Sequence, residues 1–291
     1  MLKPASAEYT LRSWQPSDVP DLEEIFTVSF GDPPEIARAF HRSFLTRPTA
    51  CTVAAVPEEG RPGGRAVSAM YCLPGPALRF SPDEAADSVY LYALGTLPSW
   101  RRRGIGMAVY REMMVRSLKE APVSCIIPAS EDLARKYCEF RPLLPLGSSR
   151  TAEVPGSRAQ AAKPLPAEPV PWRTYDGLRE EILSGRPHAS CPESWYRLME
   201  EFGNVFLRIP GALAAVIPLE GRCTVTELLC PEADPARALA GVAAACPAEN
   251  YTVRTPVFFP GPGEAGPYAR YAAAGKSPAV PEDFWYPFGL E

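Results

Sequence analysis

The chain has 291 residues, of which 46% are hydrophobic and 22% are charged. At about 100–200 residues per domain, this length predicts two domains, each with a full hydrophobic core, and the composition excludes a disordered tail. The 30 basic and 34 acidic residues leave a formal charge of −4, so we expect neither a nucleic-acid nor a membrane partner, and any phosphate binding has to be local.

The cysteines and histidines predict no metal site. The eight cysteines include no C-x-x-C pair, and the only histidines are His41 and His188. Most cysteines stand in apolar runs such as Cys125-Ile126-Ile127, which indicates reduced, buried thiols. Because the first residues lack the apolar stretch of a secretory signal and no apolar run approaches the length of a bilayer span, we expect a cytoplasmic protein.

The first half of the chain predicts a mixture of strands and helices. Apolar alternation and short apolar runs predict strands at residues 9–14, 50–56, 65–72, 88–97 and 122–127. Helical spacing of apolar residues predicts helices after Ser17, after Asp32-Pro33, over residues 107–118 and after Ser130. The resulting order is β-α-α-β-β-β-α-β-α.

Residues 154–172 are rich in proline and have no apolar periodicity. They predict a linker between a first domain, residues 1–153, and a second domain, residues 173–291. In the second domain the S-x-x-E spacing of Ser190 and Glu193 predicts a capped helix. Strands are then expected at 205–209, 212–217, 223–230 and 251–257, with a helix at 235–245. This order resembles that of the first domain and predicts an internal structural repeat, the alternative being a coincidence common among α/β chains.

Three consecutive arginines, Arg101, Arg102 and Arg103, stand directly before a predicted helix. A helix N-terminus carries unpaired N–H groups and a partial positive charge, so further positive charge is unfavourable there unless an anion is bound. Gly104 and Gly106 let the backbone approach such an anion closely, and together the two signals predict a pyrophosphate site. A solvated basic turn is the alternative.

The other phosphate-binding motifs do not fit this loop. The lysine of a Walker loop is absent, and Val109 stands where a dinucleotide fingerprint has its third glycine. In the second domain, residues 231–237 replace the arginines by acidic residues and have no G-x-G. If both domains share a fold, only the first can bind an anion at this position.

The run from Leu94 to Gly106 resembles the GNAT-family N-acetyltransferases. It supplies an apolar strand, Pro98, and then the family pattern [Q/R]-x-x-G-x-[G/A] at the start of a helix. The resemblance covers about residues 8–145. It implies the GNAT (acyl-CoA N-acyltransferase) fold, a mixed, mostly antiparallel sheet flanked by helices, and the repeat adds a degenerate GNAT-like second domain that lacks the cofactor loop.

The resemblance also implies site residues. Backbone groups of Leu94, Gly95 and Thr96 would bind the pantetheine arm and polarise the thioester carbonyl. The pyrophosphate of acetyl-CoA would be wrapped by Arg101, Arg102, Arg103, Gly104, Ile105, Gly106 and Met107. Ser130 stands where the family often has an asparagine. Tyr137 stands where the family commonly has the tyrosine that protonates the CoA thiolate, although an apolar stripe with Leu133 and Phe140 also permits a core role.

The chain departs from the family pattern on the acceptor side. Arg141-Pro142 replaces a common Gly-Phe, and the strand at 122–127 has no carboxylate to act as a base. The first helix does contain Asp18, Asp21, Glu23 and Glu24, which we interpret as solvated helix-start carboxylates. We interpret both histidines as surface or partly packed residues. The sequence therefore predicts no general base.

These observations predict an acetyltransferase that moves an acetyl group from acetyl-CoA directly to a small-molecule or peptide amine, without a metal. The second domain would close the acceptor cleft or dock a partner, and a homodimer is one option for the assembly. The alternative functions are a non-catalytic acyl-CoA-binding or interaction protein, and a binder of another phosphorylated ligand. Apolar residues near the C-terminus are expected to pack on one domain: Phe284, Trp285, Tyr286 and Phe288.

Overall fold

The computed structural model describes residues 8–286, which form two compact units. The first unit contains the chain up to Gly75, Asp87–Leu143 and Ala272–Ser277. The second contains Pro76–Ala86, Leu144–Tyr271 and the residues from Pro278 onward. Both units are therefore discontinuous in sequence, and their boundaries differ from the predicted ones at residues 153 and 173.

The first unit is built on a sheet in the order β1-β2-β3-β6-β7, with β17 beside β7. The pairs β1–β2, β2–β3 and β3–β6 are antiparallel, whereas β6 and β7 are parallel. The strands are β1 (Thr10–Ser13), β2 (Cys51–Glu58), β3 (Arg61–Pro74), β6 (Ser88–Thr96), β7 (Val123–Ile126) and β17 (Arg270–Ala273). Of β17, only Ala272 and Ala273 belong to this unit. The helices are α1 (Val19–Phe30), α2 (Pro34–Phe44), α3 (Ile105–Glu120) and α4 (Glu131–Cys138), with single 3₁₀ turns at Pro16–Asp18, Pro48–Ala50 and Pro98–Trp100.

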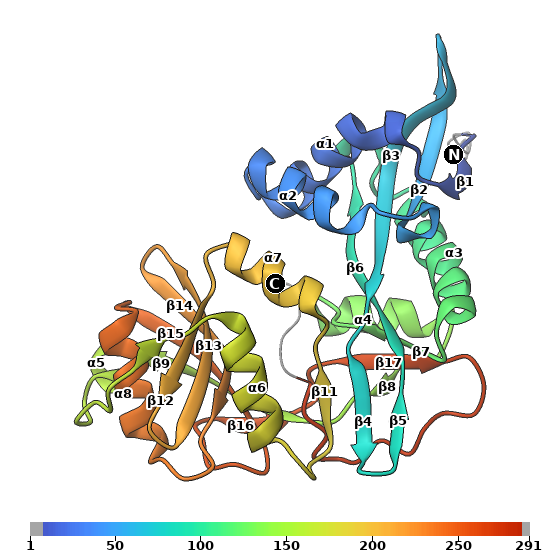
Figure 1. Ribbon diagram of the computed structural model, residues 1–291. Helices are drawn as coiled ribbons and strands as arrows, with labels where there is room; N and C mark the ends of the chain where they lie inside the picture. The colour runs from blue at the N-terminus through green and yellow to red at the C-terminus, as the bar shows by residue number, and fades with distance from the viewer. Residues whose placement is uncertain (1–7, 287–291) are drawn as a thin grey trace. The chain divides into compact units, whose positions relative to one another are not determined.

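Helices cover both faces of this sheet, with α1 and α2 on one face and α3 on the other (Figure 1). The alternation of side chains along β3 explains the arrangement. Met70 and Cys72 pack in a core cluster with α3, whereas the ring of Tyr71 between them lies 5.0 Å from that of Phe40 on α2. Because both faces are covered, the central strands are buried on both sides and read as continuous apolar runs.

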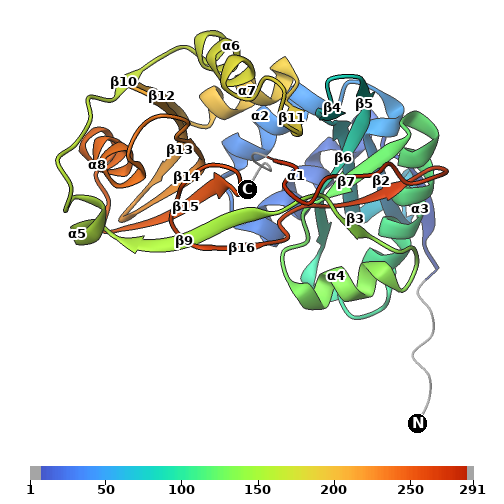
Figure 2. The same cartoon turned by 90° about the horizontal axis from the view of Figure 1, so that it is seen from below.

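The second unit has a sheet in the order β10-β12-β13-β14-β15-β9-β16 and a three-stranded sheet in the order β11-β4-β5. Figure 2 shows β9 as the long strand beside β15. The strands are β4 (Ala77–Ser81), β5 (Glu84–Ala86), β8 (Leu144–Pro145), β9 (Ser149–Pro155), β10 (Glu168–Pro169), β11 (His188–Ser190), β12 (Val205–Ile209), β13 (Ala212–Leu219), β14 (Arg222–Leu229), β15 (Asn250–Pro256) and β16 (Glu264–Gly266). The helices are α5 (Gly156–Ala159), α6 (Trp172–Ile182), α7 (Glu193–Glu201) and α8 (Pro235–Ala245).

The two sheets share one construction. In the second unit β12, β13 and β14 are antiparallel, α8 follows, and β15 returns parallel to β14. In the first unit β2, β3, β6, α3 and β7 follow the same sequence of pairings. In both units the parallel pairing covers only four residues, Ser88–Leu91 with β7 and Arg222–Val225 with β15. The predicted order of elements is thus found in each unit.

The predicted linker at residues 154–172 differs from the structure. These residues complete β9, form α5 and β10, and belong to the second unit. The amide of Gly156 donates to Glu249 O and that of Leu165 to Arg237 O, so the segment is fixed by backbone hydrogen bonds even though its prolines remove donors. The sequence also gave no indication of the β4–β5 hairpin.

The helix predicted from the spacing of Ser190 and Glu193 begins elsewhere. Pro192 is the N-cap of α7, and Ser190 belongs to β11, where its hydroxyl donates to Glu180 Oε2 at 2.9 Å. The predicted capping box was therefore wrong, because a side-chain partner outside the helix engages the serine. Among the described helices, none combines the length and apolar character that a bilayer span requires.

A buried ion pair stabilises the second unit. Arg179 on α6 and Glu227 on β14 lie 2.9 Å apart (Nε to Oε2) with both side chains fully buried. Tyr175 and Trp285 also donate hydrogen bonds to the Glu227 carboxylate. The network attaches the C-terminal segment to the sheet, and Phe284, Trp285 and Tyr286 are buried as predicted. The fourth residue of that prediction, Phe288, lies outside the described residues.

Candidate functional site

In the first unit, β7 is paired only with the first half of β6, so the sheet has an opening beside the second half of β6. Pairing with β7 ends at Leu91 and Ile126, and Ala93 has a positive φ of 51° where the register with β3 shifts, which is a β-bulge. The Leu97 amide donates to Val67 O of β3 at 2.9 Å. Because successive backbone groups point to opposite strand edges, those of Leu94 and Thr96 face the opening.

Gly95 lies between these two residues and faces α1. A Cβ at this position would be 2.7 Å from Ile25 Cγ2 and 2.8 Å from Ser29 Oγ. Any larger residue would push the helix off the strand, so the close approach requires glycine. Packing of α1 on β6 thereby fixes one wall of the opening.

The N-terminus of α3 faces the same opening. Gly104 is its N-cap with φ +79°, and the first intrahelical hydrogen bond runs from the Ala108 amide to Gly104 O at 3.0 Å. The amides of Ile105, Gly106 and Met107 precede that bond and have no acceptor within the helix. A Cβ on Gly106 would lie 3.2 Å from Thr96 Oγ1, so its absence keeps the helix close to β6.

All three arginines before α3 are exposed. Arg101 Nε–H donates to Thr96 O at 2.8 Å, and the Arg103 guanidinium lies 4.8 Å from the centroid of the Trp100 ring. Within residues 8–286, none of the three forms an ion pair with a carboxylate. Their positive charge adds to that of the helix N-terminus without a protein counter-ion, as an anion site requires.

Tyr137 of α4 lies beside the same opening. Its side chain is buried, and burial raises the pKa of its phenol above the usual value. The ring stacks on that of Tyr110 from α3, with centroids 4.1 Å apart and planes inclined by 19°. Among the described residues, none provides a hydrogen-bond partner for the buried Tyr110 hydroxyl. Tyr137 therefore combines a core position with contact to the cavity.

These elements enclose a cavity of about 880 Å³. Nine of the predicted site residues line it: Leu94, Thr96, Arg101, Arg102, Gly104, Ile105, Gly106, Met107 and Tyr137. The other three do not. Gly95 is buried under α1, Arg103 lines a neighbouring cavity, and Ser130 is exposed at the N-cap of α4, where its hydroxyl accepts the Leu133 amide.

Six lining residues were not predicted: Ser29, Phe30, Trp100, Leu133, Lys136 and Glu139. Leu133 stands four residues before Tyr137 on the same face of α4, a spacing that could have indicated it, whereas Lys136 and Glu139 do not have this spacing from Tyr137. Ser29 and Phe30 come from the far end of α1, and no local pattern connects that helix to the loop at 101–106. Phe30 is 44% exposed, unusual for so large an apolar side chain.

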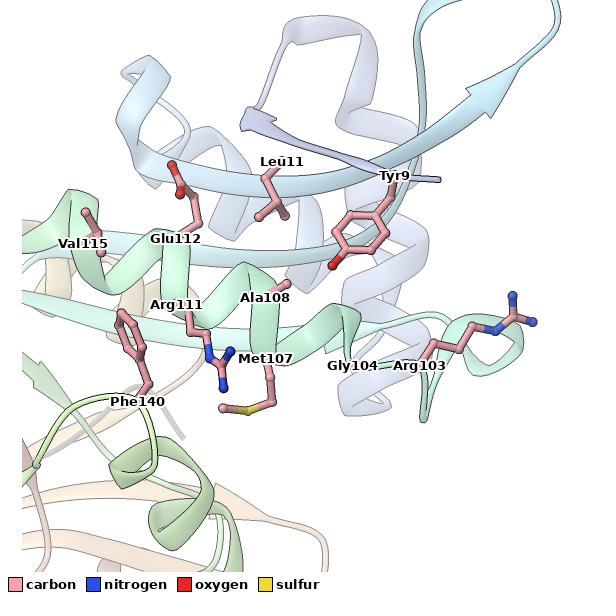
Figure 3. Close-up of a pocket in the computed structure, with 10 residues that line it drawn as sticks. All are labelled: Tyr9, Leu11, Arg103, Gly104, Met107, Ala108, Arg111, Glu112, Val115 and Phe140. Carbon is pink, nitrogen blue, oxygen red and sulfur yellow. The ribbon is translucent and has the colours of Figure 1, made fainter. Parts of the chain in front are cut away.

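A second cavity, of about 520 Å³, lies along α3 and shares Gly104 and Met107 with the first (Figure 3). It is bordered by Tyr9 and Leu11 of the N-terminal region, by Arg103, Ala108, Arg111, Glu112 and Val115 from the loop and helix, and by Phe140 after α4. The two cavities meet at the N-terminus of α3.

The first-helix carboxylates do not line either cavity, and two of them are not solvated. Asp18 is fully buried and accepts two hydrogen bonds from Arg12, at 2.6 and 2.8 Å. Asp21 is also buried and lies 2.8 Å from the Arg61 guanidinium. The prediction of solvated carboxylates was wrong for these residues, because Arg12 and Arg61, which come from two different strands, neutralise them.

Neither histidine lies at the surface. His41 is packed among aromatic rings with its Nε2 2.8 Å from the Tyr71 hydroxyl, and burial lowers its pKa to about 4. His188 Nε2 lies 3.2 Å from Glu180 Oε2. Within residues 8–286, no group of three histidine, cysteine or acidic side chains is arranged to hold a metal ion, and all eight cysteines are free thiols.

The corresponding helix of the second unit carries a carboxylate at its N-terminus. Asp234 is the N-cap of α8, and its side chain accepts the Arg237 amide at 2.9 Å. The carboxylate satisfies one of the free amides and complements the helix dipole. An anionic ligand would meet a like charge there, in contrast to the N-terminus of α3.

Comparison with solved structures relates this architecture to known proteins. A GCN5-related N-acetyltransferase from Kribbella flavida matches with a TM-score of 0.63 and 14% identity, over 92% of this chain and 72% of the other. A GCN5-related N-acetyltransferase from Sphaerobacter thermophilus gives a TM-score of 0.52 and 14% identity, over 94% and 98%. A Pyrococcus horikoshii protein gives 0.62 and 13%, over 99% and 95%.

No family model matches the chain, and no curated protein matches it by sequence. The structural matches nevertheless extend over most of the chain. The chain has the GNAT fold, that of the GCN5-related N-acetyltransferases.

Proposed function

We propose that the protein is an N-acetyltransferase that moves an acetyl group from acetyl-CoA directly to a primary amine. The supporting observation is the 880 Å³ cavity, where the N-terminus of α3 and its arginines meet the unpaired edge of β6 and Tyr137. The anion site can bind the phosphates of acetyl-CoA, and the free strand edge can pair with its amide-containing arm. The phenol can protonate the thiolate that leaves.

In this proposal, backbone groups and arginines bind acetyl-CoA. The free amides of Ile105, Gly106 and Met107, with Arg101 and Arg102, would bind the pyrophosphate. The peptide-like pantetheine arm would pair with the backbone of Leu94 and Thr96 as an added strand. A Thr96 or Leu94 amide directed at the thioester oxygen would stabilise the negative charge that develops there.

Direct transfer proceeds by attack of a neutral amine on the thioester carbon. The C–N bond forms, the C–S bond breaks, and the sulfur leaves as a thiolate that takes a proton from the Tyr137 phenol. Burial keeps this phenol protonated at neutral pH, as a general acid must be. The amine loses its proton to solvent, and the Tyr137 phenolate takes a proton from solvent, which restores the phenol. Glu139 is the one carboxylate among the residues that line the cavity.

In this proposal the first unit performs the transfer and the second unit does not bind the co-substrate. The difference is supported by Asp234, which places a carboxylate where the first unit has arginines. The free cysteines are compatible with a reducing cytoplasm. The acceptor is proposed to be a small-molecule or peptide amine.

The test has two stages. Isothermal titration should detect binding of acetyl-CoA, with weaker or no binding of ATP and NAD. CoA release is then followed across a panel of amines for the parent and for Tyr137→Phe. Absence of acetyl-CoA binding contradicts the proposal. Binding without turnover for any amine would instead favour a non-catalytic acyl-CoA-binding protein.

A further inference from the structure

Lys136 stands directly before Tyr137 on α4, and both residues line the cavity of about 880 Å³. Their Cα atoms are about 3.8 Å apart, as for any two consecutive residues. The Tyr137 side chain is buried, whereas Lys136 is exposed. The cavity therefore contains a primary amine, carried on a flexible four-carbon stem, next to the phenol that is proposed to protonate the CoA thiolate.

No counter-ion within residues 8–286 holds the Lys136 ammonium. It forms no ion pair in this part of the chain, although Glu139 lines the same cavity. The preceding residue, Arg135, is paired instead with Asp132. Because a lysine without a salt bridge keeps its rotational freedom, the amine can turn into the cavity as well as toward solvent.

Positive charge alone does not account for a lysine at this position. Five of the 30 basic residues in the chain are lysines, and the rest are arginines. Arg101 and Arg102 line the same cavity, but an arginine side chain does not lose its proton in proteins and so cannot attack a thioester. A lysine amine attacks once it has lost a proton. Among the described residues that line this cavity, Lys136 is the only one with an amine side chain.

We propose that Lys136 is an internal acetyl acceptor, which takes the acetyl group of bound acetyl-CoA when no external amine is present. The proposal rests on the proposed function, because it needs acetyl-CoA in this cavity with its thioester near Tyr137. It adds a covalent modification site to the cavity wall.

The transfer to Lys136 follows the same chemistry as the transfer to an external amine. The Lys136 ammonium loses a proton to solvent, and the neutral amine attacks the thioester carbon. The C–N bond forms, the C–S bond breaks, and the thiolate takes the Tyr137 proton. Solvent then accepts the second proton of the attacking nitrogen and returns a proton to the phenolate. The products are acetylated Lys136 and free CoA.

Acetylation of Lys136 removes one positive charge from a cavity that is proposed to bind a polyanion. The basic side chains that line it are those of Arg101, Arg102 and Lys136, against the single carboxylate of Glu139. The modified protein should therefore bind acetyl-CoA more weakly. A protein that has co-substrate but no acceptor would in this way lower its own affinity for the co-substrate.

The first experiment measures the modification itself. The full chain is incubated with isotopically labelled acetyl-CoA and no external amine, and the label at each lysine is followed by peptide mass spectrometry. Lys119, Lys163 and Lys276 are internal controls, because they are exposed and line neither cavity. At about 0.1 mM acetyl-CoA, these controls meet a thioester roughly tenfold more dilute than the effective concentration of about 1 mM that tethering gives Lys136. Lys136 should therefore be labelled at least about tenfold faster than the controls.

Two variations of this experiment test whether the transfer occurs within one molecule. The fraction of Lys136 labelled per minute should stay constant when the protein is diluted, because a reaction between two copies would slow in proportion. Excess CoA should protect Lys136 by occupying the cavity and should leave the labelling of the three control lysines unchanged.

A pair of variants tests the effect on affinity. Lys136→Arg keeps the charge and removes the acceptor, whereas Lys136→Gln also removes the charge, as acetylation does. Calorimetry should show that Lys136→Gln binds CoA about two- to fivefold more weakly than Lys136→Arg, as for one exposed charge. The same two substitutions at Lys119 should leave the affinities equal. Because residue 136 is exposed, all variants should keep the circular dichroism and melting temperature of the parent.

Three results would overturn the proposal: labelling of Lys136 no faster than that of Lys119, a rate that falls in proportion to protein concentration, and labelling that persists in excess CoA. Equal affinities of the two Lys136 variants contradict the weakening of co-substrate binding. Acetyl-CoA binding and turnover of an external amine are measured on the same preparation. If both are present, the proposed function stands and only the internal acceptor fails. A parent that binds no acetyl-CoA contradicts the proposed function itself.

Discussion

The rings of Tyr110 and Tyr137 stack with their centroids 4.1 Å apart, which joins the phosphate-side helix α3 to the helix that carries the proposed acid. Both side chains are buried, and the stack leaves the Tyr137 ring little freedom to rotate away from the cavity. The orientation of the phenol therefore depends on a residue with no contact to the cavity of its own.

Replacement of Tyr137 by phenylalanine should lower kcat by about 100-fold, the usual contribution of one general acid, and change the KM for acetyl-CoA little. Burial raises the pKa of the phenol, so the group stays protonated throughout the neutral range. The kcat of the parent should accordingly show no decrease near pH 10, where an ordinary phenol would lose its proton. Steady-state rates between pH 6 and pH 10.5 measure both effects. If the kcat of Tyr137→Phe equals that of the parent, Tyr137 is not the general acid.

Tyr110 permits a matched pair of substitutions. Tyr110→Phe removes a buried hydroxyl for which residues 8–286 provide no hydrogen-bond partner, so the unfolding free energy should stay equal or rise. Tyr110→Ala removes the stacked ring and should lower stability by about 3–5 kcal/mol. Urea denaturation gives both values. A marked loss for Tyr110→Phe would show that the hydroxyl has a partner after all.

The glycine before α3 tests the anion site. Gly104 has φ +79° and open space around its Cβ position, so Gly104→Ala and Gly104→Glu share a backbone cost of about 1 kcal/mol. Only the glutamate adds a negative charge beside the free amides. We expect Gly104→Glu to abolish CoA binding and Gly104→Ala to retain most of it, as measured by calorimetry. Equal affinities for the two variants would indicate that the pyrophosphate lies elsewhere.

His41 should make stability depend on pH. Its pKa is lowered from 6.5 to about 4 in the folded protein, so between these values the unfolded chain binds a proton that the folded chain does not. Stability should therefore fall as the pH falls from 6.5 to 4, by up to about 3 kcal/mol from this group. The slope of unfolding free energy against pH should be smaller in His41→Phe. An unchanged slope would assign the effect to other groups.

The buried ion pair of the second unit gives a prediction about stability alone. Glu227→Gln removes the fully buried counter-ion of Arg179 and leaves its guanidinium with Glu180 alone, a partly exposed carboxylate 3.0 Å away. It should lower the unfolding free energy by about 3 kcal/mol, the lower end of the range for a broken buried pair. Glu193→Gln, on an exposed pair with Arg197, should change it by less than about 1 kcal/mol. Denaturant titration of the two variants provides the comparison.

The sequence predicted those parts of the fold that local patterns determine. The strands around β12–β14, the helix from Pro235 and the glycine-capped α3 all follow from apolar periodicity and from proline or glycine at helix ends. The run from 94 to 106 likewise contains eight of the fifteen residues that line the cavity of about 880 Å³, because contiguous residues at a strand end and a helix start lie close in space.

Interactions between distant segments could not be predicted in this way. Asp18 has the spacing of a solvated helix-start residue, but Arg12 of β1 and Arg61 of β3 form ion pairs with it and make its burial favourable. Phe30 enters the cavity because α1 packs on β6 at Gly95, which depends on the tertiary fold. Tyr137 matched both a core stripe and an active-site position, since a phenol has an apolar ring and a polar end.

The discontinuity of the two units limits how the protein can be divided. A fragment that ends at residue 153 would lack Ala272, which belongs to the core beside α3, and Ala274, whose amide donates to Pro122 O. A fragment that begins at residue 173 would lack β4, the partner of β11, and β9, the partner of β15. Each fragment would expose apolar surface and unpaired strand edges and would tend to aggregate. Truncation is therefore a poor way to assign activity to one unit, and point variants of the complete chain are the appropriate tool.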